Sequence, residues 1–224
     1  MTAGFAISYV GREGQPLVTL DDFAPDPDAL RTAAIGSQFG PAAHYYPGVR
    51  ATLPADYMVG RMPLIAAAID AAFGLHGKVA LIDASFSIVT RPPGLLSVQQ
   101  RLPHCDAFAR RRIAFIQYLS PDGGDGTAFY RHRSTGFETV DEARRPIFFG
   151  QLDAELRLGG LPPSAYVAGD TPLFEQIALA EARYNRALLY PSYLLHSGAI
   201  APDAVLSADP AAGRLTITAF LTVE

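Results

Sequence analysis

A chain of 224 residues with 49% hydrophobic content can bury one full core, and its length suits a single β-rich domain. The formal net charge of −4 and a pI near 5.7 argue against a general nucleic-acid binder or a protein of anionic membrane surfaces, because both need a basic face. We therefore expect one domain over residues 1–224, with a small molecule or a peptide as its partner.

Residues 1–77 have the pattern of helices and turns, and we expect them to form a helical support region. Asp26-Pro27-Asp28 is a typical helix start, and Pro54-Ala55-Asp56 opens a second helix. The apolar face of this second helix includes Met58, Met62, Ile65 and Ile69. The longest apolar-rich stretch, residues 63–75, is shorter than the roughly 20 residues that a membrane span needs. It predicts a buried helix.

The N-terminus and the cysteine content both favour the cytoplasm. Residues 1–15 have neither a basic start nor a continuous apolar run, so they do not resemble an export signal. Cys105 is the single cysteine and cannot form an internal disulfide, the usual mark of an oxidising compartment.

From residue 78 onward the chain changes to short runs rich in Val, Ile, Phe, Tyr and Thr, which predict strands. The candidate strands are residues 84–90, 113–119, 127–130, 173–182, 186–190 and 214–223. Many short strands with turn signals are typical of a sandwich, jelly roll or barrel, so we expect a β core over residues 78–224. An insert at about 134–171 interrupts this core, with a helix at 141–156 and a surface loop at 159–171.

His104 and Asp106 are the first candidates for chemistry. Residues two apart on an extended strand project from the same face, so this imidazole and this carboxylate could reach one metal ion. His196, at the end of an apolar run, supplies a second imidazole. Two histidines and one carboxylate on one face of a metal leave open positions opposite, which is the arrangement of non-haem Fe(II) oxygenases.

Arg214 and Thr216 follow His196 at an interval of 18 residues to the arginine. On a strand these two side chains share a face, and a guanidinium with a hydroxyl can hold a carboxylate through charge-assisted hydrogen bonds. Such a pair suits the distal carboxylate of 2-oxoglutarate.

With His104-x-Asp106, then His196, then Arg214-x-Thr216 in this order, the chain resembles the Fe(II)/2-oxoglutarate-dependent dioxygenase superfamily (prolyl-hydroxylase-like) over about residues 95–224. It looks most similar to an uncharacterised bacterial family within that fold, through the Gly-rich turn at 123–126, Tyr184-Asn185-Arg186 and His196-Ser197-Gly198. The interval of 18 residues before Arg214 is longer than in many members, and the turn at 207–213 could absorb the excess.

The resemblance implies a mainly β fold with flanking helices, a double-stranded β-helix of the jelly-roll, cupin-like type. It implies Fe(II) held by His104, Asp106 and His196, and 2-oxoglutarate held by Arg214 and Thr216 with Tyr118 nearby. The implied reaction consumes O2 and hydroxylates an unknown small molecule or a peptide or protein side chain. The residues that we expect to contact the substrate are Gln99, Tyr130, His132 and Asn185.

Two other functions stay open. One is a cupin-like protein that binds Zn(II) or another divalent ion without oxidation, as a hydrolase, isomerase or sensor, since affinity alone does not select iron. The other is a non-catalytic scaffold, because fold does not imply function. Arg214-x-Thr216 favours the oxygenase, and a serine hydrolase is disfavoured because the chain has no Gly-x-Ser-x-Gly elbow.

Several residues have a structural interpretation that is as good as a functional one. His44 and His76 have no partner at ligand spacing, and Arg110-Arg111-Arg112 is more typical of a solvated loop than of an anion site. In the loop at 39–52, Tyr45, Tyr46 and Arg50 could cover the site or form a packed turn. The pattern is compatible with a homodimer and does not require one.

Overall fold

The computed structural model describes residues 4–42, 45–121 and 126–224, which form two antiparallel sheets and three α-helices. The larger sheet has, in spatial order, β1 (Ala6–Val10), β2 (Gln15–Leu20), β9 (Ala187–Pro191), β6 (Arg112–Tyr118), β11 (Leu215–Val223), β5 (Val79–Val89), β4 (Gly48–Thr52) and β3 (Gly40–Pro41). The smaller sheet has β10 (His196–Gly198), β7 (Gly126–His132) and β8 (Phe174–Glu181). The protein is therefore mostly β.

Helices α1 (Pro27–Ile35) and α2 (Ala55–Phe73) cover the outer face of the larger sheet. Asp26 caps α1 by accepting the backbone N–H of Ala29 at 2.9 Å, as its place before Pro27 predicts. The core on this side is made of alternate strand residues and the apolar faces of both helices, among them Leu30, Met58, Ile65, Ile69, Phe86, Phe115 and Ile217.

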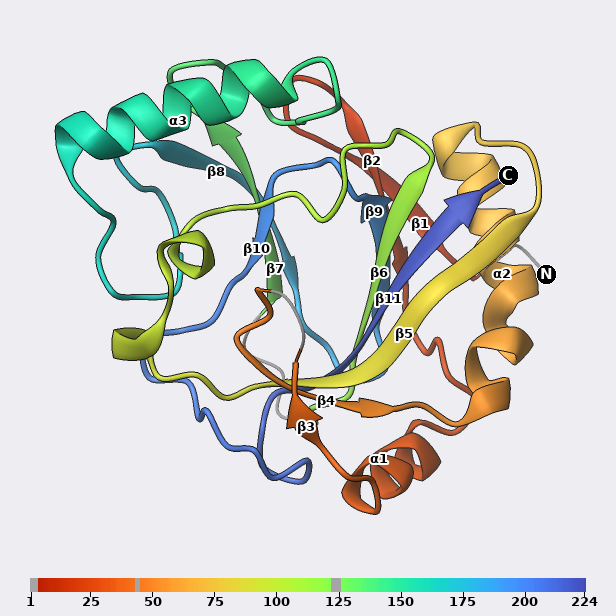
Figure 1. Ribbon diagram of the computed structural model, residues 1–224. Coiled ribbons are helices and arrows are strands. Elements are labelled where there is room, and N and C mark those ends of the chain that lie inside the picture. The colour runs from red at the N-terminus through yellow and green to blue at the C-terminus, as the bar shows by residue number, and fades with distance from the viewer. Residues whose placement is uncertain (1–3, 43–44, 122–125) are drawn as a thin grey trace.

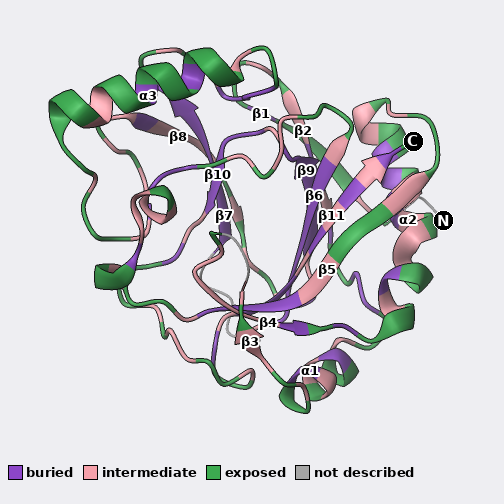
Figure 2. Cartoon of the chain, viewed as in Figure 1, coloured by how far each residue is buried: buried purple, intermediate pink, exposed green. Residues whose placement is uncertain are grey.

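The opposite face of the larger sheet looks toward the smaller sheet. Strand alternation sends Ala114, Ile116 and Tyr118 to this side, where they pack with Phe129 of β7 and Tyr190 of β9. Figure 1 shows the smaller sheet lying between the larger sheet and α3 (Arg145–Gly159), and Figure 2 shows how much of both sheets is buried. The molecule is thus layered, and the space between the sheets is lined by both of them.

Helix α3 packs on the outer face of the smaller sheet. Phe148 and Leu152 of the helix contact a buried cluster that contains Ala128, Tyr130 and Phe174 of the strands. The helix lies inside the predicted insert, four residues later at its start than expected. None of the helices in the described parts of the chain has the length and apolar character that crossing a bilayer requires.

The strands expected after residue 78 are present, but the first 77 residues differ from the prediction of helices and turns. They hold the two expected helices and also β1 to β4. Two of these strands gave little signal, because β1 is exposed at four of its five residues and β3 has only two residues. The Gly-rich turn expected before residue 127 lies, apart from Gly126, outside the described residues.

Candidate metal centre

His104 and His196 meet through their backbones. Each donates its N–H to the carbonyl of the other at 2.9 Å, which forms an isolated antiparallel bridge beside β10. The two rings lie with centroids 4.5 Å apart. Asp106 is fixed in the same way, since its N–H donates to the Ser192 carbonyl at 2.9 Å. Backbone hydrogen bonds therefore bring together three side chains that come from two distant parts of the sequence.

The ligand atoms of these three residues form one cluster. Oδ1 of Asp106 lies 3.8 Å from Nε2 of His104, and Oδ2 lies 3.3 Å from Nε2 of His196. Bonds of about 2.1 Å let two ligands of one ion lie up to roughly 4.2 Å apart, so both pairs fit a shared metal. All three candidate atoms lie within 4.8 Å of one another, so a small movement of the side chains would bring them around one ion. The three residues predicted as ligands could hold a metal ion.

The hydrogen bond of His196 leaves the correct nitrogen for a metal. Its Nδ1 donates to the Leu194 carbonyl at 2.9 Å, so Nε2 carries the lone pair on the side of Asp106. His196 is buried, whereas the His104 side chain is 51% exposed. The cluster is thus anchored on one side and open to a ligand on the other.

The charges of His104 and Asp106 suit metal binding at neutral pH. The surrounding protein and the neighbouring His196 lower the pKa of His104 to about 4, which leaves this imidazole neutral. Burial opposes ionisation of Asp106, but His196, His104 and the more distant Arg50 together lower its pKa. Burial also opposes the charge on His196, yet Asp106 raises the pKa of that imidazole. An anionic carboxylate and a neutral imidazole are the forms that ligate, so Asp106 and His104 are already in these forms. The raised pKa of His196 favours a proton on that ring, which a metal ion would displace.

Tyr118, Arg214 and Thr216, predicted to hold the cosubstrate, are brought together between the sheets. Thr216 pairs with Tyr118 across β11 and β6, so their side chains share a face. The guanidinium carbon of Arg214 lies 5.7 Å from the Tyr118 ring centroid, and Nη2 donates to the Gly126 carbonyl at 3.0 Å. The Tyr118 hydroxyl reaches Thr127 of the smaller sheet at 2.7 Å. These contacts span the gap between the two sheets.

Tyr190 connects this group with the metal cluster and was not singled out from the sequence. Its ring packs edge-on against His196, with centroids 4.8 Å apart. Burial raises its pKa well above the ordinary value; Asp106 and Tyr118 raise it further, and Arg214 opposes the shift. The buried Tyr190 therefore contacts His196, lies within the electrostatic influence of Asp106 and Arg214, and stays neutral.

The structure does not bring the expected substrate-contacting residues to the cluster. Tyr130 and His132 occupy the face of β7 that packs against α3, where Nε2 of His132 lies 2.8 Å from the Glu155 carboxylate. Asn185 uses its amide to bind the backbone of Ala24, on the helix-covered side of the larger sheet. Gln99 is exposed on a short 3-10 helix (Val98–Arg101). Tyr130, His132 and Asn185 therefore lie on faces that point away from the cluster, and the alternation of side chains along a strand does not tell which face lines a pocket.

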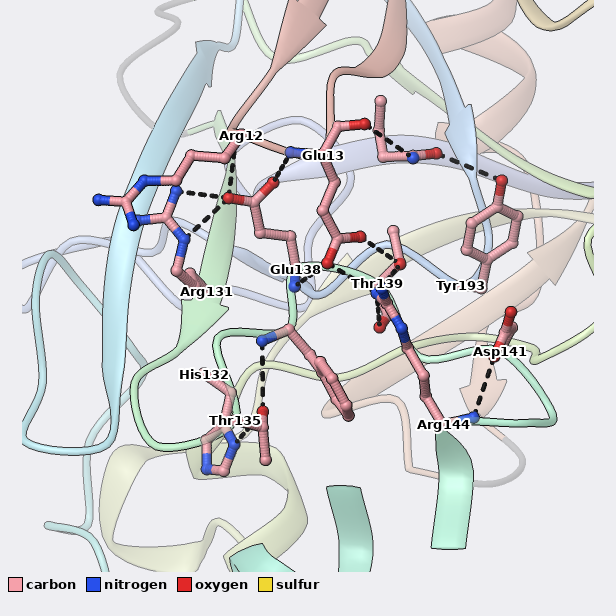
Figure 3. Close-up of polar contacts among 12 residues, drawn as sticks. Arg12, Glu13, Arg131, His132, Thr135, Glu138, Thr139, Asp141, Arg144 and Tyr193 are labelled. Carbon is pink, nitrogen blue, oxygen red and sulfur yellow. Dashed lines mark hydrogen bonds and ion pairs between the residues drawn. The ribbon is translucent and has the colours of Figure 1, made fainter. Parts of the chain in front are cut away.

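A buried ionic network, shown in Figure 3, supports the segment that carries His196. The Glu138 carboxylate accepts the backbone N–H groups of Arg12 and Glu13, each at 2.9 Å, and the Arg131 guanidinium. The Glu138 carbonyl in turn accepts the Leu195 N–H at 2.8 Å. This network joins the β1–β2 turn to the residues next to His196, and no motif in the sequence predicts it.

Arg144 and Thr139 extend this network toward a polar cavity. Both bind the Glu13 carboxylate, with Nη1 of Arg144 at 2.6 Å. The cavity has a volume of about 290 Å³ and is lined by Glu13, Gln15, Arg110, Thr139, Arg144 and Tyr193. The charged side chains that line the cavity already form ion pairs, Arg110 with Asp141 and Arg144 with Glu13, so they do not indicate a ligand.

Comparison with known proteins places the chain by family and by fold. A family model described as "Family of unknown function (DUF6445)" matches residues 2–221. No curated protein matches the chain. HygX from Streptomyces hygroscopicus, whose crystal structure has nickel, 2-oxoglutarate and hygromycin B bound, is similar at 9% identity and a TM-score of 0.52, over 94% of this chain and 84% of that one. The likeness to HygX is a likeness of fold.

Two further solved structures are similar at lower scores. AviO1 from Streptomyces viridochromogenes Tue57 has 12% identity and a TM-score of 0.46, over 98% of this chain and 90% of its own. An N-substituted L-amino acid dioxygenase from Burkholderia ambifaria AMMD has 13% identity and a TM-score of 0.43, over 94% and 83%.

Proposed function

Since the chain belongs to DUF6445, a family whose description assigns no activity, we propose from the site itself that the protein is an Fe(II)- and 2-oxoglutarate-dependent oxygenase. The observation that carries this proposal is the His104–Asp106–His196 cluster, with two imidazoles and one carboxylate gathered on one side and an exposed edge on the other. Two histidines and one carboxylate that leave open positions are the ligand set of such enzymes.

We further propose that the two facing sheets are the halves of a double-stranded β-helix within a single domain over residues 1–224. The antiparallel pairing of all neighbouring strands and the fold likeness to HygX support this interpretation. The histidine ligands would then come from the smaller sheet and the loop that pairs with it, and the cosubstrate residues from the larger sheet.

In this proposal His104, Asp106 and His196 hold Fe(II), and Arg214 with Thr216 holds the distal carboxylate of 2-oxoglutarate beside Tyr118. When bound, the metal would activate O2, which is the oxidant of the hydroxylation, and 2-oxoglutarate would supply two of the four electrons that O2 accepts, the substrate supplying the other two. The carbonyl of Leu194 keeps Nε2 of His196 directed at the cluster. Tyr190 and Phe129, with rings 5.2 Å apart, exclude water from the buried side of His196.

The substrate in this proposal is a small molecule or a peptide. The half-exposed His104 side chain leaves room for a molecule to approach the cluster from solvent. HygX has an organic molecule, hygromycin B, in its crystal structure, which agrees with a small-molecule substrate for a protein of this fold.

The test is anaerobic visible spectroscopy of metal-free protein to which Fe(II) and then 2-oxoglutarate are added. We expect a charge-transfer band that needs both additions and is weakened in Arg214→Ala. The exposed Arg183, 63% accessible, gives a matched control as Arg183→Ala, which should keep the full band. Iron binding without any band would overturn the oxygenase and favour a cupin-like metal protein.

A further inference from the structure

The loop between α3 and β8, residues 160–171, is fastened to the segment that follows β5. We call this loop the strap. Nη1 of Arg101, at the end of the 3-10 helix, donates to the Pro162 carbonyl at 3.3 Å. The Tyr166 hydroxyl donates to the Arg91 carbonyl at 2.7 Å. Figure 1 shows the strap leaving α3 and passing beside the 3-10 helices before it enters β8.

The Tyr166 hydrogen bond ties the strap to the residues proposed to hold the cosubstrate. The N–H of Arg91 donates to the Pro47 carbonyl at 3.1 Å, so the peptide segment that Tyr166 binds is itself bound to the residue after Tyr46. The Tyr46 hydroxyl in turn hydrogen-bonds to Thr216. A short chain of contacts therefore connects the strap with the proposed position of the 2-oxoglutarate carboxylate.

The phenol of Tyr166 is half-buried and stays uncharged. Burial and the nearby Tyr46 raise its pKa to about 12, and the charges of Arg91 and Arg214 oppose this shift. Solvent screens charges within about 8–10 Å, so a half-buried group senses a guanidinium only when the two are close. Tyr166 therefore lies near Arg214 as well as on the strap.

The rest of the strap has few buried contacts. Of residues 160–171, all of them described, only Val167 is buried, and it packs with Tyr130 on the α3 side. Gly160 has φ +84° and Gly169 has φ +69°, and an added Cβ at either position would meet no atom within 4 Å. Such backbone conformations favour glycine, and segments with little buried apolar surface open locally most readily. The strap thus has a glycine near each end, one apolar anchor and one tyrosine hydrogen bond beside the pocket.

We propose that the strap is a lid on the Arg214 pocket and that Tyr166 is its latch, a positioning residue that acts through the Arg91 carbonyl. The inference rests on the proposed function for one point, which is that the molecule admitted is 2-oxoglutarate. The loss of one neutral hydrogen bond changes the population of an open form about threefold. A latch of this strength suits a lid that opens in every catalytic cycle.

The first measurement is access to Arg214 in protein without metal or cosubstrate, followed as the rate at which phenylglyoxal modifies this guanidinium. Peptide mass spectrometry resolves each arginine separately. We expect Tyr166→Phe to raise the rate at Arg214 about threefold, because only the latching hydroxyl is lost and the open form becomes more populated. Arg183, whose side chain is 63% exposed, should react equally fast in both proteins.

Tyr184→Phe is the matched control. Its hydroxyl also donates one hydrogen bond, to Asp28 of α1 on the other side of the larger sheet. This variant should leave the rate at Arg214 unchanged. Hydrogen exchange of the strap in Tyr166→Phe should rise by the same factor as the modification rate, since both report on the open form.

The second measurement asks whether 2-oxoglutarate uses this route. Stopped-flow spectroscopy of the anaerobic Fe(II) protein follows the formation and loss of the charge-transfer band. We expect the association and dissociation rate constants of 2-oxoglutarate both to rise about threefold in Tyr166→Phe while the Kd changes less than twofold, because a lid alters entry and exit alike. A residue that merely contacts the cosubstrate would change the Kd.

Each result decides the proposal. Equal phenylglyoxal rates at Arg214 in wild type and Tyr166→Phe would overturn the lid, and so would a rise at Arg183 as large as the rise at Arg214, since it would reflect general loosening. A faster reaction at Arg214 with unchanged rate constants for 2-oxoglutarate would overturn its entry under the strap. If wild-type protein forms no band, the proposed function fails, whereas the phenylglyoxal rates still decide the lid.

Discussion

Two carboxylates, those of Glu138 and Asp106, lie beside the segment at 193–196, and they differ in how their charges are satisfied. Glu138 is 0% exposed and accepts two backbone N–H groups and the Arg131 guanidinium. Asp106 faces two imidazoles, and none of the guanidinium groups in the described residues hydrogen-bonds to it. A carboxylate whose acceptor positions are taken by arginine and amide donors stabilises the fold, whereas a carboxylate that faces imidazole nitrogens is available to an ion.

The first prediction concerns removal of the Asp106 carboxylate, and its expected effect exceeds those of the predictions that follow. Asp106→Ala should lower the affinity for Zn(II) or Co(II) by more than about 100-fold, because even a partner of a metal ligand is worth 10–100-fold. Competition with a chromophoric chelator measures the change. Glu138→Gln keeps the shape of its side chain and should bind metal within a few fold of wild type. Equal affinity in Asp106→Ala and wild type would mean that the cluster is not a metal site.

The second prediction concerns removal of the buried Glu138 carboxylate. Glu138→Ala leaves the Arg131 guanidinium, 9% exposed, without its buried partner, and should lower the free energy of unfolding by about 3–5 kcal/mol. Urea denaturation measures this loss. The matched control is Glu175→Ala, because Glu175 pairs with the same arginine but is 39% exposed and should cost less than about 1 kcal/mol. Equal losses in the two variants would contradict a special role for burial.

Two glycines in the β1–β2 turn allow a test of how firmly the Glu138 carboxylate is held in place. Gly11 has φ +67°, and an added Cβ would lie 2.1 Å from the Glu138 carboxylate; Gly14 has φ +61° and open space around it. Gly14→Ala should cost about 1–2 kcal/mol through its backbone alone. Gly11→Ala should cost roughly 1–3 kcal/mol more, because the carboxylate has to move. Unfolding of both variants in urea gives the difference, and a difference of zero would show that Glu138 yields freely.

The last prediction concerns the dependence of folding stability on pH, and its expected effect is the smallest. The pKa of Glu138 is lowered, since the N–H groups at Glu13 and Arg12 and the Arg131 charge outweigh its burial. The unfolded chain then takes up a proton more readily than the folded one, so this contribution is present above the ordinary pKa of 4.5 and is lost as the pH falls below it. Stability measured between pH 7 and pH 3.5 should therefore decline less steeply in Glu138→Gln than in wild type. Parallel curves would refute the linkage.

The sequence predicts much of the sheet because its central strands carry a clear signal. The runs at 84–90, 113–119 and 214–223 are β-branched and aromatic, and they became β5, β6 and β11. The two helices before residue 77 were predicted from the helix-start residues Asp26-Pro27 and Pro54. Strands β1 and β3 were missed because an exposed or very short strand at the edge of a sheet has almost no hydrophobic periodicity. Strands β2 and β4 lie inside the sheet and were missed because Pro16 and Gly48 are residues typical of turns.

The candidate site was predictable only where residues close together in the sequence belong to the same site. His104-x-Asp106 and Arg214-x-Thr216 are such local patterns; the first pair lies in one cluster, and both residues of the second lie beside Tyr118. The Glu138 network joins residues about 125 positions apart in the sequence, and no spacing reveals it. Asn185 and His132 are local signals that the sequence could not place, because alternation separates the two faces of a strand without indicating which face lines a pocket.

The bridge between His104 and His196 also has a consequence for the shape of the chain as a polymer. Position 196 follows position 104 by 92 residues, and the enclosed loop contains β6, β7, α3, β8 and β9. Closing a loop of this length costs about 4 kcal/mol of chain entropy. An ion held by both histidines would act as a removable crosslink, dividing the chain into a closed central ring and two tails. Under a pulling force on the termini, we expect the ring to open only after the ion has left.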